Sequence, residues 1–252
     1  MMKGIDVAKW NGVIDWAKVK KAGVEFAVLK VIDKSNKTES SFVRNYAGAS
    51  AQGLPLDVYN YLYTITEAAA REAAKAVVNA LAGRKVGKVW ADVEDACLKN
   101  KGILLIRIIN TYKAVIEAAG YEFGVYTGLS FYNSYIKPYK DYIDCDFWIA
   151  RYPSTKDMII TMDPAVSKKP SISHNLWGWQ YSSKGKISGI SGYVDLDICY
   201  TKADSNGTMQ STTVYYPRYT GTSASIVAAL NAVGVNSSYA TRKSIAKENG
   251  IT

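Results

Sequence analysis

The sequence is poor in histidine and cysteine, and these shortages exclude several kinds of catalytic site. Its single histidine, His174, stands in the polar run 171–175. One histidine excludes most zinc centres and any Ser-His-Asp triad that does not use it, and the polar run indicates an incidental loop residue. Cys97, Cys145 and Cys199 are odd in number and form no C-x-x-C pair. We therefore expect three buried free thiols, and neither a disulfide framework nor a thiolate metal site.

Long apolar runs are absent as well. No stretch approaches the roughly 18 consecutive apolar residues of a membrane-spanning helix. The chain begins with a strand-like pattern at residue 3 and shows no apolar leader, so the sequence predicts neither membrane insertion nor a secretory signal.

Runs of Lys and Arg are also lacking, although the chain is basic. It carries 31 Lys and Arg against 22 Asp and Glu, a formal net charge of +9. Such a charge suits a polyanionic partner. Because no basic arm of the nucleic-acid-binding kind is present, the charge favours an anionic polymer such as a bacterial wall over nucleic acid.

Apolar alternation and helix-ending glycines predict an α/β fold. With 252 residues and 48% hydrophobic content, the chain can form a barrel of about 200 residues and a small appendage. Strands are expected at residues 3–7, 25–32, 56–62, 88–94, 122–126, 145–150, 176–181 and 193–199. Helical segments at 15–23, 40–51, 66–83, 102–119 and 129–136 lie between the first six. This alternation predicts a parallel sheet closed into a TIM-like (β/α) barrel, irregular because no helices are evident after the sixth and seventh strands.

The strand at 88–94 carries the strongest candidate for reactive chemistry. Trp90, Asp92 and Glu94 share one face of this strand, which places the two carboxylates about 6–7 Å apart. Like charges held that close beside a tryptophan should separate their pKa values, leaving one acid protonated and one ionised near neutral pH. Such a pair can split a glycosidic bond, although a solvated strand end would show the same short pattern.

Four acids fall at or near the ends of predicted strands: Asp6, Asp92, Glu94 and Asp195. In barrels of this kind the chemistry gathers at the carboxyl ends of the strands, so their convergence favours a site. Six aromatic residues near strand ends are candidates for contacts with sugars, with core packing as the alternative for each: Trp10, Tyr61, Tyr126, Trp148, Trp179 and Tyr181. Lys30, within an apolar strand, should need an acid partner and is expected to neutralise part of the cluster.

Several segments together resemble the family 25 glycoside hydrolases, the bacterial and phage lysozymes that cut N-acetylmuramoyl linkages in peptidoglycan. They run in the family's order over residues 3–200: Gly4-Ile5-Asp6-Val7 with Trp10-x-Gly12, Ala47-Gly48-Ala49 with Gly53-Leu54, Asp92-Val93-Glu94, Trp148-Ile149-Ala150-x-Tyr152, and Trp179-Gln180-Tyr181-Ser182 leading to Gly192-Tyr193-Val194-Asp195-Leu196-Asp197.

The resemblance implies roles for the four acids. Glu94 is implied as the general acid, Asp92 as the residue that orients the substrate's N-acetyl group, and Asp6 and Asp195 as groups that position the substrate and tune charge. It implies retention of configuration, with the N-acetyl group as nucleophile and a carboxylate nucleophile as the alternative. Lys30 and the aromatic residues are expected to bind the polymer, and no metal or cofactor is implied.

Three segments depart from the family pattern. Lys9 stands where a small polar residue is common, Val31-Ile32-Asp33-Lys34 replaces an Ala-Thr-Glu-Gly-like run, and Tyr59-Asn60-Tyr61 replaces Tyr-His-Phe. The second and third departures lie at strand ends, so we expect the subsite contacts there to differ from those of the family.

The remaining residues predict a linker and a small helical module. Residues 201–213 are small and polar, and helical patterns follow at 223–233 and 239–248. The segment 214–252 resembles the wall-binding modules of clostridial phage and prophage lysins, and its size predicts that it leans on the barrel, the wall or a second copy of itself.

The sequence therefore predicts an endolysin that waits in the host cytoplasm until the membrane is opened and then acts on the cell wall. A non-catalytic peptidoglycan-binding protein and a metal-dependent carbohydrate esterase are the alternatives. The four acids weigh against the first and the poor ligand set against the second.

Overall fold

The computed structural model describes residues 1–200, 221–223, 225–232, 237–239 and 242. The chain divides into two compact units, Met1–Gln210 and Ser211–Thr252. The predicted linker lies outside the described residues, as do all of the predicted helix at 239–248 except residues 239 and 242. Within the second unit, α6 (Ile226–Ala232) forms inside the predicted helix at 223–233 and buries Leu230.

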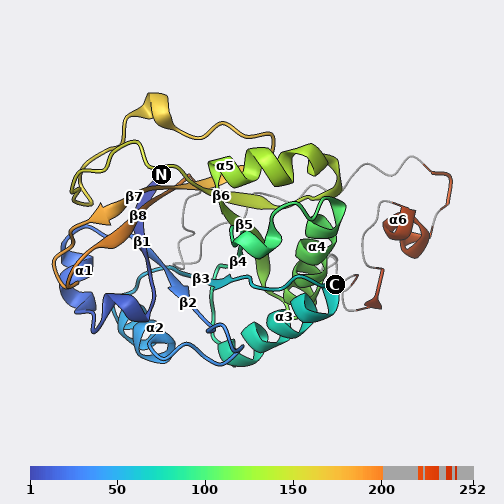
Figure 1. Ribbon diagram of the computed structural model, residues 1–252. Helices are drawn as coiled ribbons and strands as arrows, with labels where there is room; N and C mark the ends of the chain where they lie inside the picture. The colour runs from blue at the N-terminus through green and yellow to red at the C-terminus, as the bar shows by residue number, and fades with distance from the viewer. Residues whose placement is uncertain (201–220, 224, 233–236, 240–241, 243–252) are drawn as a thin grey trace. The chain divides into compact units, whose positions relative to one another are not determined.

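The first unit is an eight-stranded closed barrel whose strands follow one another in sequence order (Figure 1). They are β1 (Met2–Val7), β2 (Phe26–Lys30), β3 (Leu56–Tyr61), β4 (Lys88–Asp92), β5 (Glu122–Gly128), β6 (Asp146–Ala150), β7 (Leu176–Gly185) and β8 (Val194–Cys199). This confirms the predicted irregular (β/α) barrel.

Strand β8 departs from the predicted parallel sheet. Strands β1 to β7 pair in parallel, whereas β8 is antiparallel to both β7 and β1. The connection from β7 to β8, residues 186–193, is shorter than the dozen or more residues that a parallel crossover needs. The reversal brings the start of β8 to the carboxyl end of the other strands, where Asp195 pairs in register with Asp6.

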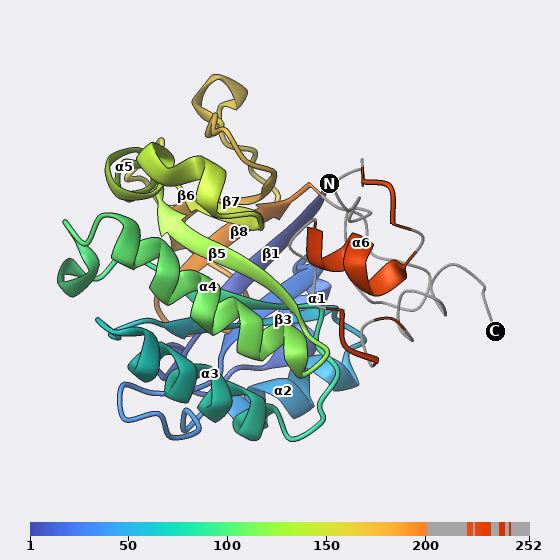
Figure 2. The ribbon, with the colours of Figure 1, turned by 90° about the vertical axis from the view of Figure 1, so that its right-hand side faces the viewer.

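Helices cover the outside of the barrel after each of the first five strands. They are α1 (Trp16–Lys21), α2 (Phe42–Ala51), α3 (Glu67–Leu81), α4 (Ile103–Ala118) and α5 (Leu129–Phe131), which continues into a π turn (Tyr132–Ile136). The side chains of Asp15 and Thr66 accept backbone N–H groups at the starts of α1 and α3, as expected of N-caps. Figure 2 shows α3 and α4 side by side.

Short 3-10 turns complete the described first unit: Lys9–Asn11, Ala96–Leu98, Lys137–Tyr142 and Val166–Lys168. The connection from β6 to β7 contains only the last of these and no α-helix, as the sequence predicted.

None of the helices in the described ranges has the length and apolar character that a membrane crossing requires.

Large side chains fill the barrel interior: Phe26, Val28, Trp90, Tyr126, Trp148, Trp177 and Cys199. Glycine makes room for them, since a Cβ at Gly124 would lie 2.2 Å from Trp90 Cζ3 and one at Gly4 would lie 2.4 Å from Phe26 Cε1. Val89, Ala91 and Val93 face outward into the main core. The predicted alternation of β4 is therefore confirmed, and the structure shows that Trp90 lies on the inward face.

Two predictions about individual side chains need correction. Cys199 is buried, but Cys97 and Cys145 are only partly buried. Cys97 lies in the turn that follows β4, and Cys145 lies immediately before β6. His174 is more than an incidental loop residue: its Nδ1 lies 2.7 Å from the Tyr132 hydroxyl, and its ring packs on Phe147 at 4.6 Å between centroids.

Candidate active site

The four predicted acids come together at the carboxyl end of the barrel. Asp6 lies near the end of β1 opposite Asp195, Asp92 is the last residue of β4, and Glu94 follows two residues later. Burial makes the largest contribution to the raised pKa values of Asp6 and Asp92, and the charges act on one another as well: Asp195 and Glu94 raise the pKa of Asp6, and Glu94 and Asp6 raise that of Asp92. The strand ends thus form one acidic cluster.

Asp92 and Glu94 differ in their access to solvent. Asp92 is 5% exposed, and its Oδ1 is buried without a hydrogen-bond partner in the described part of the chain. Burial and then Glu94 raise the pKa of Asp92, while Lys30 opposes the rise. Glu94 is half-buried, and burial followed by Asp95 raises its pKa too. We expected the two pKa values to move apart. In the structure both pKa values are raised, because burial acts on each acid.

Asp6 is held by a glutamine that the sequence reading did not single out as a site residue. Gln180 Nε2 donates to Asp6 Oδ2 at 2.7 Å. The Tyr126 hydroxyl donates to Gln180 Oε1 at 2.7 Å, and the Tyr152 hydroxyl donates to the same oxygen. Two donors on Oε1 fix the orientation of the amide, so its N–H must face Asp6. Gln180 stood in the quoted Trp-Gln-Tyr motif, but only the register of β7 shows that it points inward.

Asp197 is the second site residue that sequence reasoning missed. It is fully buried on β8, accepts from Trp148 Nε1 at 3.0 Å through Oδ1, and is a hydrogen-bond partner of Asp6. Its Oδ2 has no donor among the described residues. Burial, then Asp6 and then Asp195 raise its pKa. The hydrogen bond between the two acids raises the pKa of Asp197 and lowers that of Asp6, so it favours the proton on Asp197, while burial and Asp195 keep the pKa of Asp6 raised. The alternation of β8 from Asp195 was the signal that could have found it.

Asp195 lies at the edge of the cluster. It is half-buried, and burial followed by the charge of Glu94 raises its pKa to about 6. A carboxyl with that pKa is largely ionised at neutral pH and gains its proton in weakly acidic solution.

Lys30, expected to neutralise part of the cluster, and Tyr61, a candidate sugar contact, both lie beside the acids. The Lys30 Nζ lies 5.7 Å from the ring centroids of both Tyr59 and Tyr61, and its charge lowers the pKa of Asp92. The Tyr61 hydroxyl donates to Asp95 Oδ2 at 3.3 Å. Lys30 is therefore the expected counter-charge of the cluster, placed beside the acids by two tyrosine rings.

Of the other five predicted sugar contacts, Trp10 is 82% exposed and the remaining four are buried. Tyr126 and Trp148 are buried in the barrel interior, where they bond Gln180 and Asp197. Trp179 and Tyr181 lie in the main core outside the barrel, at 2% and 0% exposure. The expectation that these rings face the sugar is corrected: on β7 the residue facing the acids is Gln180, and its odd-numbered neighbours at 179 and 181 point away.

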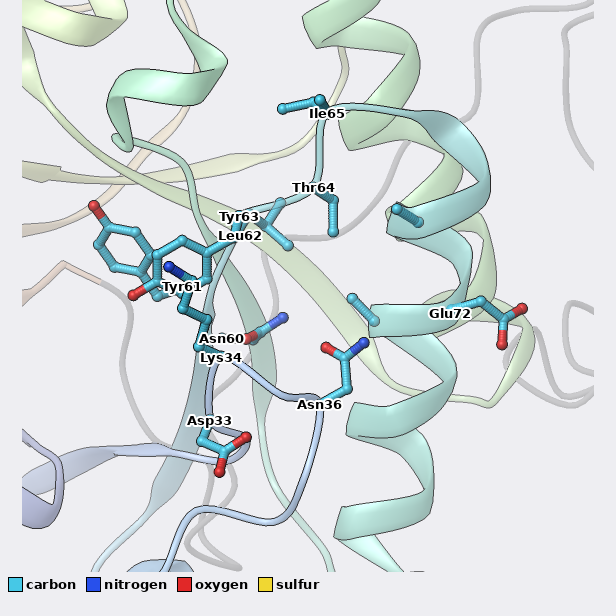
Figure 3. Close-up of a pocket in the computed structure, with 12 residues that line it drawn as sticks. Asp33, Lys34, Asn36, Asn60, Tyr61, Leu62, Tyr63, Thr64, Ile65 and Glu72 are labelled. Atoms are coloured by element: carbon cyan, nitrogen blue, oxygen red, sulfur yellow. The ribbon is translucent and has the colours of Figure 1, made fainter.

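Two pockets lie at this end of the barrel. One of about 490 Å³ is lined by Glu94, Gly128, Leu129, Ser130, Asn133, Ala150, Arg151 and Tyr152. The other, of about 350 Å³, is lined by residues of the connection after β2, of β3 and its following loop, and of α3 (Figure 3). Asp33, Lys34, Asn60 and Tyr61 line this second pocket, so the two strand-end departures from the family pattern meet there. Within the described residues, no group of three or more His, Cys, Asp or Glu side chains is arranged to hold a metal ion.

Comparison with known proteins gives a family match over most of the barrel. Residues 5–190 match the model of the glycosyl hydrolases family 25. The autolytic lysozyme of Clostridium acetobutylicum is 31% identical over 201 residues, which are 78% of this chain and 55% of that protein. Lysozyme M1 of Streptomyces globisporus is 26% identical over 204 residues, which are 77% of this chain and 66% of that protein. The chain thus spans between about half and two thirds of the length of these relatives.

Solved structures share the fold. The catalytic domain of the endolysin ply40, from bacteriophage P40 of Listeria monocytogenes, superimposes with a TM-score of 0.63 at 23% identity, covering 79% of this chain and 93% of that domain. At this identity the likeness concerns the barrel alone.

Proposed function

The chain belongs to glycosyl hydrolase family 25, and from this premise we propose that it is a muramidase that hydrolyses the β-1,4 bond between N-acetylmuramic acid and N-acetylglucosamine in bacterial peptidoglycan. The observation that carries the proposal is the pairing of two unequal acids. Glu94 is half-buried and lines an open pocket, while Asp92 is buried beside it. The two relatives named as lysozymes support the same activity.

Glu94 is the general acid. A raised pKa keeps its carboxyl protonated at higher pH than that of an ordinary glutamate. In the first step its proton passes to the glycosidic oxygen as the bond between that oxygen and the sugar C1 breaks. In the second step the Glu94 carboxylate takes a proton from the attacking water, which restores the acid.

Asp92 is the partner of the substrate's N-acetyl group. Its buried Oδ1 lacks a donor among the described residues, and an acetamido N–H would supply one. The acetamido carbonyl oxygen attacks C1 as the leaving group departs, forming a cyclic oxazolinium ion whose N–H is held by Asp92. Water then opens this ring at C1 and leaves the new reducing end with retained configuration.

Asp6 and Asp195 shape the electrostatics of this step. Gln180 and Asp197 hold Asp6 in place and oppose part of the rise in its pKa. Asp195, with a pKa of about 6, is largely ionised at neutral pH, and its negative charge beside the sugar stabilises the developing positive charge at C1. Direct attack by a carboxylate is the alternative mechanism. Equal activity on polymers that lack the N-acetyl group would favour that alternative.

Mass spectrometry of fragments released from purified walls tests the proposed bond cleavage. A new reducing end on muramic acid is the expected product. A new end on glucosamine, or released peptides, would reject the proposal. Activity that disappears with a chelator would favour the metal-dependent esterase, and binding to walls without any released fragment would favour the non-catalytic protein.

We further propose that the enzyme is an endolysin whose residues 214–252 bind the wall and self-associate, joined to the barrel by the linker at 201–213. The sequence of residues 214–252, whose helical patterns and small size predict a module that leans on another surface, supports this role. Truncation after Thr201 should keep cleavage of soluble chains and weaken binding to intact cells; a truncated protein that binds cells equally well would reject the module. Expression inside a bacterium should be tolerated until the membrane is opened, and lysis with sealed membranes would reject the endolysin role.

A further inference from the structure

Lysines and exposed aromatic rings gather beside the acidic cluster, at the ends of three neighbouring strands. Trp10 follows β1, Lys184 and Lys186 lie at the end of β7, and Tyr193 immediately precedes β8. We define the lysine-aromatic rim as Lys9, Trp10, Lys184, Lys186 and Tyr193. Because β1 and β8 carry the paired acids Asp6 and Asp195, the rim lies at the same end of the barrel as the candidate active site.

The rim is joined by specific contacts. The Nζ atoms of Lys184 and Lys186 lie 4.3 and 3.9 Å from the Tyr193 ring centroid, and Lys9 Nζ lies 4.8 Å from that of Trp10. Asn11 Nδ2 donates to the Tyr193 carbonyl at 3.2 Å and connects the two parts. Trp10 is 82% exposed and Tyr193 is 44% exposed, so both rings present apolar surface to solvent.

The charge of the rim is opposite to that of the neighbouring cluster. In the described part of the chain, none of its three lysines takes part in a salt bridge. Three acids lie nearby: Asp157 accepts the Tyr193 hydroxyl at 2.9 Å, Glu39 accepts the Lys9 backbone N–H at 2.9 Å, and Asp33 is close enough for the charge of Lys9 to lower its pKa. Lys184 and Lys186, two cations beside the Asp157 carboxylate, make the Tyr193 side of the rim attractive for anions, whereas the adjoining cluster repels them.

We propose that the lysine-aromatic rim binds the carboxylate groups of the short peptides that branch from the muramic acid residues of the wall polymer. This inference rests on the proposed function, because it takes the sugar backbone to lie along the acidic cluster. A neutral backbone is compatible with those acids, but the carboxylates of its peptide branches are not. The branches would leave the backbone toward the lysines, and the flat faces of Trp10 and Tyr193 would contact their aliphatic parts.

Matched substrates test the rim directly. Glycan strands with intact peptides are compared with the same strands after an amidase has removed the peptides and the lactyl carboxylate that this hydrolysis exposes has been converted to a neutral amide. We expect wild-type KM to be lower on the peptide-bearing strands. Lys184→Gln combined with Lys186→Gln should raise that KM about 3- to 10-fold, the range of two exposed charge contacts, and bring the ratio between the two substrates close to 1. Added salt should reduce the wild-type preference, because it screens exposed charges.

The control removes the same charge elsewhere. Lys20 and Lys21 are exposed residues of α1, and replacing both by Gln should leave the preference for peptide-bearing strands intact. Equal KM values of the wild-type protein on both substrates, or an equal loss of preference in the control, would overturn the proposal.

A binding measurement separates failure of the rim from failure of the proposed function. The Glu94→Gln protein is sedimented with glycan strands immobilised on beads, with and without their peptides, and weaker binding to the stripped strands is the expected result. Peptide-dependent binding with no cleavage of any substrate by the wild type would reject the muramidase and keep the rim. Binding that survives peptide removal but is lost when phosphodiester polymers are extracted would reject the peptide as the rim's ligand.

Discussion

Buried charged side chains are paired at the amino end of the barrel, whereas two buried acids at the carboxyl end each have an oxygen without a hydrogen-bond donor in the described residues. At the amino end, Lys88 Nζ lies 2.6 Å from Glu122 Oε2 and 2.9 Å from Asp146 Oδ2, across the starts of β4, β5 and β6. Asp57 there accepts the Lys88 N–H and the Trp90 Nε1–H, each at 2.8 Å. At the carboxyl end, Asp92 Oδ1 and Asp197 Oδ2 are buried without donors in the described residues.

This difference indicates that the amino end contributes to stability and the carboxyl end to catalysis. A buried charge is tolerated when an opposite charge or strong hydrogen bonds offset its loss of water, and the amino end follows that rule. The carboxyl end crowds acids together, so it keeps protons that ordinary carboxyls would release. A general acid needs such a proton. The comparison therefore predicts that substitutions at the carboxyl end change activity more than stability, and that those at the amino end do the reverse.

Glu94→Gln should give the largest effect on activity. The amide keeps the shape of the side chain but cannot donate an acidic proton, and loss of a general acid commonly costs 10²–10⁴-fold in rate. The midpoint of thermal unfolding should stay the same or rise, because one like charge leaves the cluster. Reducing-end release and thermal unfolding are measured on the same preparation. Activity within tenfold of wild type in a folded variant would remove Glu94 from its role.

Lys88→Met should give the largest effect on stability. It leaves Glu122 and Asp146 without their shared cation, and breaking a buried ion pair costs about 3–5 kcal/mol. We expect about 3 kcal/mol in urea unfolding, because the Glu122 side chain is 42% exposed and water screens part of its charge. The rate per folded molecule should be nearly unchanged.

Lys75→Met is the matched control for that variant. Lys75 pairs with Glu72 at 2.8 Å on the surface of α3, where the two side chains are 55% and 64% exposed. Its loss should cost at most a few tenths of a kcal/mol. Equal destabilisation by both substitutions would show that the buried triad at the amino end has no special role.

Asp197→Asn and Asp197→Ala should separate the proton that Asp197 holds from its charge. Asparagine can accept from Trp148 and donate to Asp6, as the protonated acid does. Alanine leaves the buried Trp148 N–H unsatisfied, at about 1–3 kcal/mol. We therefore expect a smaller loss of stability and of activity for Asn than for Ala, measured by urea unfolding and by rate against pH. An Asn variant that is as impaired as Ala would mean that Asp197 acts as an ionised group.

The sequence predicted the frame of this site better than its interior. Local rules of alternation and capping predict the strands, the shared face of Val89, Ala91 and Val93, and the caps Asp15 and Thr66. Irregular closure was also predictable, since no helices were evident after the sixth and seventh strands. These features depend on neighbours in sequence, so the sequence contains them directly.

What the sequence could not predict depends on pairing between distant segments. Strand β8 enters the sheet antiparallel, and this direction sets the position of Asp195. Along β7 the register shifts relative to both neighbouring strands. With these shifts, Trp177 points into the barrel and Trp179 points out of it. A change of one residue in facing exchanges the two faces of a strand, which is why Trp179 was expected at the sugar and Gln180 was overlooked. The proton-holding role of Asp197 required its contacts with Trp148 and Asp6.

The pH dependence of stability should give the smallest of these effects. Burial raises the pKa of Asp195 to about 6, whereas an unfolded aspartate titrates near 4. Between these values the folded state binds more protons than the unfolded state, so this contribution to stability is complete below about pH 4 and is lost as pH rises through 6. The raised pKa values of Asp6, Asp92, Glu94 and Asp197 act in the same direction. At the amino end burial also raises the pKa of Asp57 to about 6, so wild-type stability should fall between pH 5 and 7.

Asp195→Asn should reduce that fall by about 1 kcal/mol, less than the roughly 2.7 kcal/mol of a full two-unit shift, because water screens a half-buried carboxyl. Urea unfolding at pH 5, 6 and 7 measures the slope, and a variant whose curve runs parallel to that of the wild type would show that Asp195 titrates alike in the folded and unfolded chain.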